Sequence, residues 1–547
     1  MRNSKNGIWN IVNNTLGKST GKDANNLRSI TEKFDTLTEA ANEINNHFAS
    51  IFVPSPDWSQ LRSRTTSLSV AWSPFVDTDI VLSYLQNLKK SKSSGSDDLS
   101  PRLLSECALE FSGPLSHLIN VSIQTGCVPR QWKIANIAPV PKTKNPSLSD
   151  LRPISLLPVM SKILEKSILK HIKERLLQCY GYNQFGFRSA SSTLHAQIYI
   201  HEFVTSNLDL PETSGVLLIS FDMSKAFDRL SHDSIIDTLI QFSFPKKFVH
   251  WICDYLQDRC QRVCLNSHIY SSIVNVSSGV PQGSILGPYL FNVQLSSLRP
   301  FSTSASMIKY ADDIIVLVPY CNNDSVDHLI HLEMSNMINW CSSRGLLINQ
   351  SKTNCMLFSC SNFRPTVSSD SLLCNTLRIL GVLFQDNLRW DQHKERTCKL
   401  AARRVKVLRV LKTELSKEDL ITVYKVYILS ILEYNSPLFV GISKKESLKI
   451  EAIRKRSHRI ICGKDCTCSH FIPLSDRRES RALKEFKALL CTDSVLNYLS
   501  PQRLTFSGHL RVPILKSKRR ACSFIPYCTV LYNKLYAKKC FQMYVQM

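Results

Sequence analysis

The sequence has no apolar run long enough to cross a membrane. A spanning helix needs about 18 or more uninterrupted apolar residues, and no stretch of the 547 residues approaches that length. The first residues, MRNSKNGIWN, lack the apolar core of a secretory signal, and no fixed-period repeat of the solenoid kind occurs. We therefore expect a protein without membrane contacts, located inside the cell in the cytoplasm and nucleus.

The sequence also lacks the paired C-x-x-C arms of a zinc finger. Its 19 cysteines follow no repeating frame, which favours reduced thiols in an intracellular protein. Metal-ligand residue types do cluster in CGKDCTCSH, at Cys462, Cys466, Cys468 and His470. Because their spacing matches no finger pattern, we interpret the cluster as incidental, with a metal site as the alternative.

Acidic residues are few compared with basic ones. The chain has 68 Lys and Arg against 44 Asp and Glu, a formal net charge of +24. This excess favours a polyanionic partner, with nucleic acid or an acidic membrane surface as the obvious options. Apolar residues at 43% and charged residues at 20% are typical of a protein with a real core, and the length favours about three domains.

The pattern changes along the chain and predicts an α+β centre with an appended helical domain. Within its helical first part, a segment rich in proline and lysine at 136–158 is expected to be extended, basic and exposed. The predicted divisions are a helical leader (1–75), a mainly helical segment (76–205), mixed strands and helices (206–390), basic helices (391–465), and a basic, partly helical region without an assignable role (466–547).

Two aspartates stand between apolar runs in SMIKYADDIIVLV, residues 306–318. The flanking apolar segments have strand length, and the four residues between them fit a tight hairpin turn. Such a turn would place Asp312 and Asp313 at its tip, where they could hold a cation. An ordinary surface turn is the alternative, and this segment alone favours it.

A third aspartate changes the balance. Asp222 ends the apolar run GVLLISFD, and an ionised carboxylate against a buried strand is costly unless something compensates it. Three carboxylates at the ends of adjacent strands suit Mg²⁺, and two such ions about 3.5–4 Å apart can clamp the oxygens of a phosphoryl transfer. The residues alone leave nucleotidyl transfer and a structural turn as open alternatives. The catalytic interpretation requires Asp222 to lie within about a dozen ångströms of the other two aspartates.

Several segments, in order, resemble the reverse transcriptases of non-LTR retrotransposons. They are KSSGSDDLSPRLL (92–104), LRPISLLPVMSKILEK (151–166), NQFGFRSASST (183–193), FDMSKAFDRLSHDSII (221–236), SGVPQGSILGPYLFNVQLSSL (278–298), YADDIIVLV (310–318) and LRILGVLF (377–384). The resemblance covers residues 75–390, with a fainter extension through 465. One departure is Asp98, which stands where glycine is commoner in the family.

This resemblance implies a right-hand polymerase. Fingers would span 76–205, a palm with an antiparallel sheet packed on helices would span 206–390, and a helical thumb would span 391–465. The implied activity is RNA-directed DNA polymerisation, in which two Mg²⁺ ions assist the transfer of dNTPs onto a primer 3′-hydroxyl. An RNA template, a DNA primer or target and an RNA-binding protein of the element would be its partners, and the basic thumb would hold the duplex through its phosphates.

The resemblance also implies roles for particular residues. Asp222, Asp312 and Asp313 would form the metal-binding triad. Phe227, five residues after Asp222, falls where the family has a steric gate against the ribose 2′-hydroxyl. Without the resemblance, Phe227 would be taken as a core aromatic.

The other implied residues would contact the incoming nucleotide or its leaving group. In GVPQG, Gln282 would donate hydrogen bonds while glycine permits close backbone approach. Lysine and arginine would hold the triphosphate, and a lysine would protonate the departing pyrophosphate. The residues are Pro281, Gln282, Gly283 and Tyr310 at the nucleotide, Lys142 and Arg152 at the triphosphate, and Lys352 as the proton donor.

Neither an endonuclease nor a ribonuclease H region is recognisable, and NGIWNIVNNTLGKST resembles the linker that follows an endonuclease in such elements. We therefore expect a fragment of a longer polyprotein or a decayed copy. One alternative function is an inactive remnant that only binds nucleic acid. Another is a group II intron maturase, a class that shares YADD but usually lacks the RPISLLP and GSILGP wording.

Overall fold

The computed structural model describes residues 5–15, 27–65, 72–266, 268–359, 372–463, 471–490, 496, 499, 509–513 and 515–545. Most of the predicted cysteine–histidine cluster, from Cys466 to His470, lies outside these residues. Cys253, Cys341, Cys355 and Cys528 are buried thiols, and the reduced state expected of the chain's cysteines stays a prediction. Within the same residues, no helix has the length and apolar character that a membrane span requires.

In the described residues, twelve strands form two five-stranded sheets and a separate hairpin. The first sheet has the order β2-β1-β4-β5, with β6 on β4, and the second has the order β10-β3-β8-β7, with β9 on β3. The strands are β1 (Ile134–Pro141), β2 (Leu151–Leu156), β3 (Gly215–Ser224), β4 (Arg259–Leu265), β5 (Ile269–Tyr270), β6 (Val274–Val276), β7 (Ser306–Tyr310), β8 (Asp313–Tyr320), β9 (Leu347–Ile348), β10 (Asn354–Ser359), β11 (Thr376–Ile379) and β12 (Val382–Gln385).

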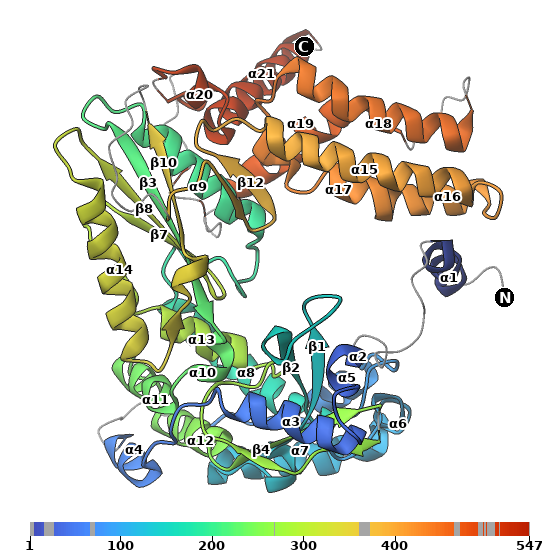
Figure 1. Cartoon of the computed structure of the whole chain (residues 1–547), viewed down its shortest axis with the longest axis vertical. Coiled ribbons are helices and arrows are strands. Elements are labelled where there is room, and N and C mark those ends of the chain that lie inside the picture. The colour runs from blue at the N-terminus through green and yellow to red at the C-terminus, as the bar shows by residue number, and fades with distance from the viewer. Residues whose placement is uncertain are drawn as a thin grey trace.

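Helices surround both sheets and continue beyond them (Figure 1). They are α1 (Lys5–Thr15), α2 (Arg28–Thr31), α3 (Leu37–Ala49), α4 (Trp58–Arg64), α5 (Thr78–Gln86), α6 (Pro101–Glu106), α7 (Ala108–Thr125), α8 (Val159–Cys179), α9 (Thr193–Asn207), α10 (Ala226–Arg229), α11 (His232–Gln241), α12 (Lys246–Leu256), α13 (Gly287–Leu295), α14 (Val326–Ser342), α15 (Asp391–Leu411), α16 (Lys417–Val423), α17 (Ser430–Leu432), α18 (Lys444–Cys462), α19 (Leu474–Leu489), α20 (Lys518–Ala521) and α21 (Phe524–Val545). The predicted α+β class, with an antiparallel sheet packed on helices, is confirmed.

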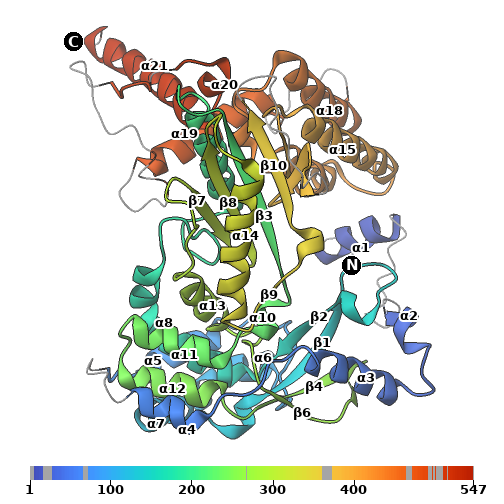
Figure 2. The ribbon, with the colours of Figure 1, turned by 60° about the vertical axis from the view of Figure 1, so that its left-hand side comes forward.

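Strand β3 is the centre of the second sheet and is buried on both faces. Side chains alternate between the two faces of a strand, so Leu217, Ile219 and Phe221 join one core, while Val216 and Leu218 join another. The first core includes residues of α14, which lies along the sheet in Figure 2, and the second includes residues of α9. This double burial explains why β3 reads as a nearly continuous apolar run.

The segment 136–158 is largely extended, as its prolines predicted, but most of it is not exposed. It forms β1, a tip at 142–150 and β2, with Pro139 opposite Pro153 in the antiparallel register. Pairing of β1 with β4 ends at Ile137, so the edge of β1 near Pro139 needs no backbone donor. The two prolines are therefore tolerated inside a largely buried hairpin. The predicted exposure is found mainly at the tip.

Sheet membership does not follow the predicted boundary at residue 205. Strands β4, β5 and β6, from the range assigned to the palm, belong to the sheet of β1 and β2. Helix α9, from the range assigned to the fingers, packs on the sheet of β3. The reason is that β1 pairs in parallel with β4, and a parallel pair requires a long crossover connection.

The C-terminal region, to which no role could be assigned from the sequence, completes the second core. Phe524, Ile525 and Cys528 of α21 are buried with side chains of β3, β8 and α9. The Arg520 guanidinium donates to the carboxylate of Glu202, which is almost fully buried on α9. This region therefore closes the back of the sheet that carries the aspartates.

Candidate active site

Asp222 and Asp313 lie directly opposite each other at the end of the β3–β8 ladder. The Cα atoms of such a pair are about 4.5–5.5 Å apart, and the side chains point to the same face. Asp312 is the neighbouring residue in the β7–β8 turn, as the sequence predicted. The three aspartates therefore satisfy the distance that the catalytic interpretation requires.

The turn that carries Asp312 is short and tightly supported. Tyr310 pairs with Asp313, which leaves only Ala311 and Asp312 between the strands, and Ala311 has a φ of 55°. A Cβ added to Gly186 would lie 2.4 Å from the Ala311 nitrogen. Glycine at 186 therefore allows the preceding NQFGF segment to support the turn from behind.

The electrostatics of the tip favour an added cation. Burial raises the pKa of Asp313 to about 6, with further contributions from repulsion by Asp312 and Asp222. Burial also raises the pKa of Asp312, and repulsion from Asp222 adds to it. Both tip residues nevertheless remain exposed to solvent. Three acids are thus held together on a surface that approaching ions can reach.

Basic side chains surround the aspartates. Lys352 Nζ lies 3.8 Å from the Asp222 carboxylate, because the Asn349 nitrogen donates to the Asp222 carbonyl and holds the following turn beside β3. Arg152 and Lys142, both exposed on the β1–β2 hairpin, act in the opposite sense to burial and lower the pKa of Asp312. The structure thus brings all three predicted cations near the acids.

The GVPQG loop is fixed between β2 and the segment that follows β3. Gly279 has a φ of 79°, and its added Cβ would lie 2.5 Å from the Phe227 carbonyl oxygen. Gly283 has a φ of 141°, and its added Cβ would lie 2.5 Å from the Ser155 carbonyl oxygen. Both positions therefore require glycine, which holds Pro281 and Gln282 between them at the site.

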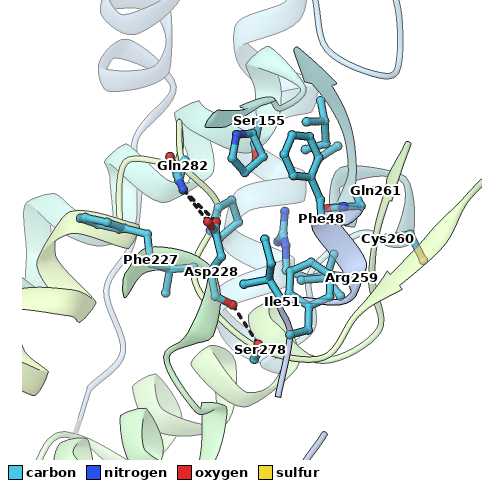
Figure 3. Close-up of a pocket in the computed structure, with 17 residues that line it drawn as sticks. Phe48, Ile51, Ser155, Phe227, Asp228, Arg259, Cys260, Gln261, Ser278 and Gln282 are labelled. Atoms are coloured by element: carbon cyan, nitrogen blue, oxygen red, sulfur yellow. Dashed lines mark hydrogen bonds between the residues drawn. The ribbon is translucent and has the colours of Figure 1, made fainter. Parts of the chain in front are cut away.

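Phe227, Asp228, Pro281 and Gln282 line one pocket (Figure 3). The Gln282 side-chain nitrogen donates to both carboxylate oxygens of Asp228 at 2.8 and 2.9 Å. The donor that was expected to be free for a nucleotide is therefore engaged by a neighbour. Phe48 and Ile51, which belong to the leader, line the far side of the same pocket.

The two predicted aromatic residues occupy different surroundings. The half-buried Phe227 ring stacks on Phe291 with centroids 4.5 Å apart and meets Phe187 edge-on at 6.2 Å. Its ring is therefore both a packing element and a rigid wall of the pocket. Tyr310 packs against the second core, and burial, with a contribution from Tyr434, raises its pKa.

Sequence reasoning missed two residues of the site, Lys225 and Asp228, both of which lie inside the segment 221–236 that carries the resemblance. Lys225, with a φ of 49°, donates to the carbonyl oxygens of Ser149 and Leu151 at 3.2 and 3.1 Å. Asp228 holds Gln282. Sequence reasoning also missed the burial of Lys309, which follows from hydrogen bonds to the carbonyl oxygens of Leu295 and Leu298 and not from a contact with the site.

The donor set suits a hard divalent cation, since it consists of three carboxylates at neighbouring backbone positions. In the part of the chain that the structure describes, no three His, Cys, Asp or Glu side chains are already gathered as a ligand set. The ion pair between Asp222 and Lys352 is consistent with this, because it draws one carboxylate toward a cationic side chain. The backbone positions are therefore in place, while the side chains would have to turn toward an ion.

The comparison with protein families agrees with this site. Residues 140–406 match the family described as "Reverse transcriptase (RNA-dependent DNA polymerase)". They contain β2, the three aspartates, Phe227, the GVPQG loop and Lys352. This part of the chain is similar to the reverse transcriptases of non-LTR retrotransposons.

Curated relatives point the same way. The chain is 26% identical over 407 residues to "Probable RNA-directed DNA polymerase from transposon BS" of Drosophila melanogaster, a match that covers 71% of this chain and 44% of the relative. It is 28% identical over 416 residues to "RNA-directed DNA polymerase from mobile element jockey" of the same species, with the same coverage. The chain therefore spans less than half the length of these relatives.

Proposed function

We propose that this chain is an RNA-directed DNA polymerase that adds dNTPs to a primer 3′-hydroxyl. The observation that carries the proposal is the register of Asp222 opposite Asp313, with Asp312 beside them, in a domain of the reverse transcriptase family. A chance surface turn would not pair its acid with a third carboxylate at the end of a buried strand. The family generally works with divalent metal ions, and we assign them to these three residues.

Each part of the site has a task in this reaction. Asp222, Asp312 and Asp313 would hold two Mg²⁺ ions, which supply the positive charge that activates the attacking hydroxyl and stabilises the leaving pyrophosphate. Lys142 and Arg152 project from the β1–β2 hairpin and are placed to hold the triphosphate. The protein thus contributes mainly orientation and electrostatic stabilisation.

The pocket next to the acids is suited to the sugar of the nucleotide. Phe227 presents a ring that packing against Phe291 and Phe187 keeps from moving aside, so a 2′-hydroxyl would meet a fixed wall. Gln282 is held by Asp228. This part of the site would therefore select deoxynucleotides by shape.

Helices α15 and α18 are suited to hold the primer–template duplex. Their exposed faces are strongly basic, and Arg409, Arg456 and Arg459 converge on one groove between them. Contacts of this kind neutralise phosphates without reading sequence. The basic surface is therefore suited to hold an RNA template paired with a DNA primer, and the three aspartates are suited to extend that primer.

Primer extension on an RNA template with Mg²⁺ and dNTPs tests the proposal. We expect extension by the wild-type chain and only background extension by Asp312→Ala, whereas Asp35→Ala, an exposed aspartate of the leader, should behave as wild type. If the wild-type chain does not extend a primer while its salt-sensitive RNA binding persists, the chain is a nucleic-acid-binding remnant and the proposal is wrong.

Lys352 can be tested within the same assay. General acid catalysis contributes roughly 10²–10⁴-fold to a rate, so Lys352→Ala should lower the rate of single-nucleotide addition by a factor in that range. Lys352→Arg keeps the charge near Asp222 but donates a proton poorly. A rate for the arginine variant equal to that of wild type would assign Lys352 a purely electrostatic role.

A further inference from the structure

A second pocket, separate from the acids, is lined by four lysines. It has a volume of about 230 Å³ and lies between α5, the turn that follows it, and the first turns of α8. We call it the lysine pocket. Its lining consists of Tyr84, Asn87, Leu88, Lys89, Lys92, Ser93, Pro101, Val159, Lys162, Ile163, Lys166 and Ile285. All of these residues belong to the described part of the chain, and none of them is acidic.

The positive charge of the lysine pocket has little internal compensation. Glu165 lies next to Lys166 in the chain, but it is fully buried and its carboxylate accepts from the nitrogens of Ile285 and Leu286 at 2.6 and 3.0 Å. Burial lowers the pKa of Lys162, and repulsion from Lys92 lowers it further, against the opposing effect of Glu165. A bound anion would relieve this repulsion.

The floor of the pocket is apolar and partly aromatic. Leu88, Val159, Ile163 and Ile285 contribute aliphatic surface. The Tyr84 ring lies under Lys166 Nζ, which is 3.9 Å from its centroid. A single nucleic-acid strand presents phosphates together with flat bases that pack on such surfaces. A free phosphate would leave the floor unused, and a duplex keeps its bases away from it.

The lysine pocket lies close to the pocket that Phe227 and Gln282 line. Ile285 lines the lysine pocket, and Gln282 lines the pocket drawn in Figure 3. Three residues of chain span at most about 11 Å, so the two pockets lie on either side of one loop. Both ends of this loop are fixed, because the Ser155 nitrogen donates to the Gln282 carbonyl at 2.9 Å and Glu165 accepts from Ile285.

The other parts of the proposed complex, the triphosphate and the duplex, have binding surfaces of their own. The triphosphate would lie at the β1–β2 hairpin, and the duplex at α15 and α18. Figures 1 and 2 show these two helices at the opposite end of the molecule from α5. The strand without a binding surface is the unpaired template that enters the site.

We propose that the lysine pocket binds the single-stranded RNA template immediately ahead of the site of synthesis. This proposal rests on the polymerase function proposed above. The four lysines contact the template phosphates, and a base packs against Tyr84 and the aliphatic floor. The pocket keeps the template strand single and directed toward the GVPQG loop.

The test compares two double variants of the full chain with the same change of charge. Lys89→Gln with Lys166→Gln alters the lysine pocket. Lys90→Gln with Lys170→Gln alters exposed neighbours on the same two segments that do not line it. Binding of an RNA–DNA primer–template is measured over a range of salt concentrations, once with a long unpaired 5′ RNA overhang and once with an overhang of a single nucleotide.

We expect the pocket variant to lose affinity for the long overhang only. Each lost phosphate contact flattens the plot of log affinity against log salt by about 1, so its slope should be shallower by about 2. The control variant should match wild type on both substrates. Equal losses on both overhangs, or equal behaviour of the two variants, would overturn the proposal.

Two further measurements separate this proposal from the one on which it rests. Extension by one nucleotide on the short overhang reports the polymerase alone, and the pocket variant should retain the wild-type rate. If the wild-type chain binds the primer–template but does not extend the primer, the polymerase function is wrong. The effect of the overhang on binding can still be measured in that case. Competition by inorganic phosphate that equals competition by single-stranded RNA would identify a simple anion site and contradict the template proposal.

Discussion

The side-chain nitrogen of Gln282 donates to both oxygens of the Asp228 carboxylate, at 2.8 and 2.9 Å, and only 9% of Asp228 is exposed. This contact joins the segment after β3 to the GVPQG loop, and thereby couples Phe227 to Gln282. Burial raises the pKa of Asp228 to about 6, although the hydrogen bond from Gln282 and the charges of Lys225 and Lys142 lower it. The pair is therefore held together at a cost that depends on pH.

The first prediction concerns this pH dependence. Since the Asp228 pKa is about 6 in the folded chain and 3.8 without perturbation, the folded state keeps a proton that the unfolded state releases over this interval. The resulting stability is present below pH 3.8 and is lost as the pH rises through 6. Asp228→Asn has no such loss, so its free energy of unfolding relative to wild type should rise by up to about 3 kcal/mol between these limits.

Urea denaturation at several pH values measures the difference. Glu174→Gln, an exposed change on α8, is the control and should show a nearly constant offset from wild type. A constant offset for Asp228→Asn as well would mean that its carboxyl titrates normally in the folded protein.

The second prediction concerns the support of the β7–β8 turn, which carries Asp312. In Gly186→Ala the new Cβ would meet the Ala311 nitrogen at 2.4 Å, and because that atom is backbone, the turn has to shift. We expect a loss of roughly 1–3 kcal/mol of stability and a larger loss of polymerase rate, since Asp312 moves with the turn. Gly113→Ala is the matched control, because nothing lies within 4 Å of its added Cβ.

Thermal unfolding and single-nucleotide addition, measured on the same preparations, separate the two effects. If Gly186→Ala were as stable and as active as Gly113→Ala, the NQFGF segment would not support the turn.

The β7–β8 hairpin and its aspartates could be predicted from sequence because the signal is local. Apolar segments of strand length on both sides of YADD define the strands, and the turn follows from the residues between them. The residues alone left the meeting of Asp222 with Asp313 as one of two alternatives, and the resemblance was needed to choose it, since the register of two strands about ninety residues apart depends on the whole sheet.

Other contacts were beyond prediction because their partners are distant or unexpected. Lys309 follows two apolar residues, Met307 and Ile308, and nothing in the sequence marks it as buried. Lys309 is buried. Its Nζ donates at 2.7 Å to the carbonyl oxygen of Leu295, at the end of α13, and at 2.8 Å to that of Leu298, just beyond the helix. Its burial lowers its pKa to about 7. The tip of the β1–β2 hairpin was exposed as expected, but Pro139 and Pro153 were misread because an edge position makes prolines compatible with a strand.

The third prediction concerns the C-terminal region. Arg520 is the cationic partner of Glu202, whose other carboxylate oxygen accepts from the Ile525 nitrogen at 2.9 Å. Removing one partner of a buried pair leaves an uncompensated charge, so Arg520→Met should destabilise the chain by about 3–5 kcal/mol. Adding Glu202→Gln to that variant should restore much of the loss, because glutamine can still accept from Ile525.

Chemical denaturation of the single and double variants gives the comparison. Arg519→Met is the control, because Arg519 is exposed beside Arg520 in the chain, and it should change stability by less than about 1 kcal/mol. A double variant no more stable than Arg520→Met would show that Glu202 is not the source of the cost.

The fourth prediction concerns metal binding without catalysis. Mg²⁺ that binds the folded chain at about 100 times its dissociation constant should raise the free energy of unfolding by about 2.7 kcal/mol. Asp313→Asn and Asp222→Asn should lose most of this stabilisation. Without Mg²⁺, Asp313→Asn should unfold at the same temperature as wild type or at a higher one, since repulsion from Asp312 and Asp222 is relieved. An equal response of Asp313→Asn and wild type to Mg²⁺ would place the metal elsewhere.

The last prediction concerns the choice of sugar. Packing of Phe227 against Phe291 at 4.5 Å and against Phe187 at 6.2 Å leaves its ring little freedom to yield to a 2′-hydroxyl. Phe227→Val removes the ring, so the preference for dNTPs over NTPs should fall by roughly 10–200-fold, the range for a small group excluded by a pocket. Phe187→Ala, which removes an exposed neighbour outside the pocket, should keep most of the preference. The ratio of kcat/KM for dATP and ATP on the same RNA template measures it, and an unchanged ratio in Phe227→Val would mean that Phe227 only fills the core.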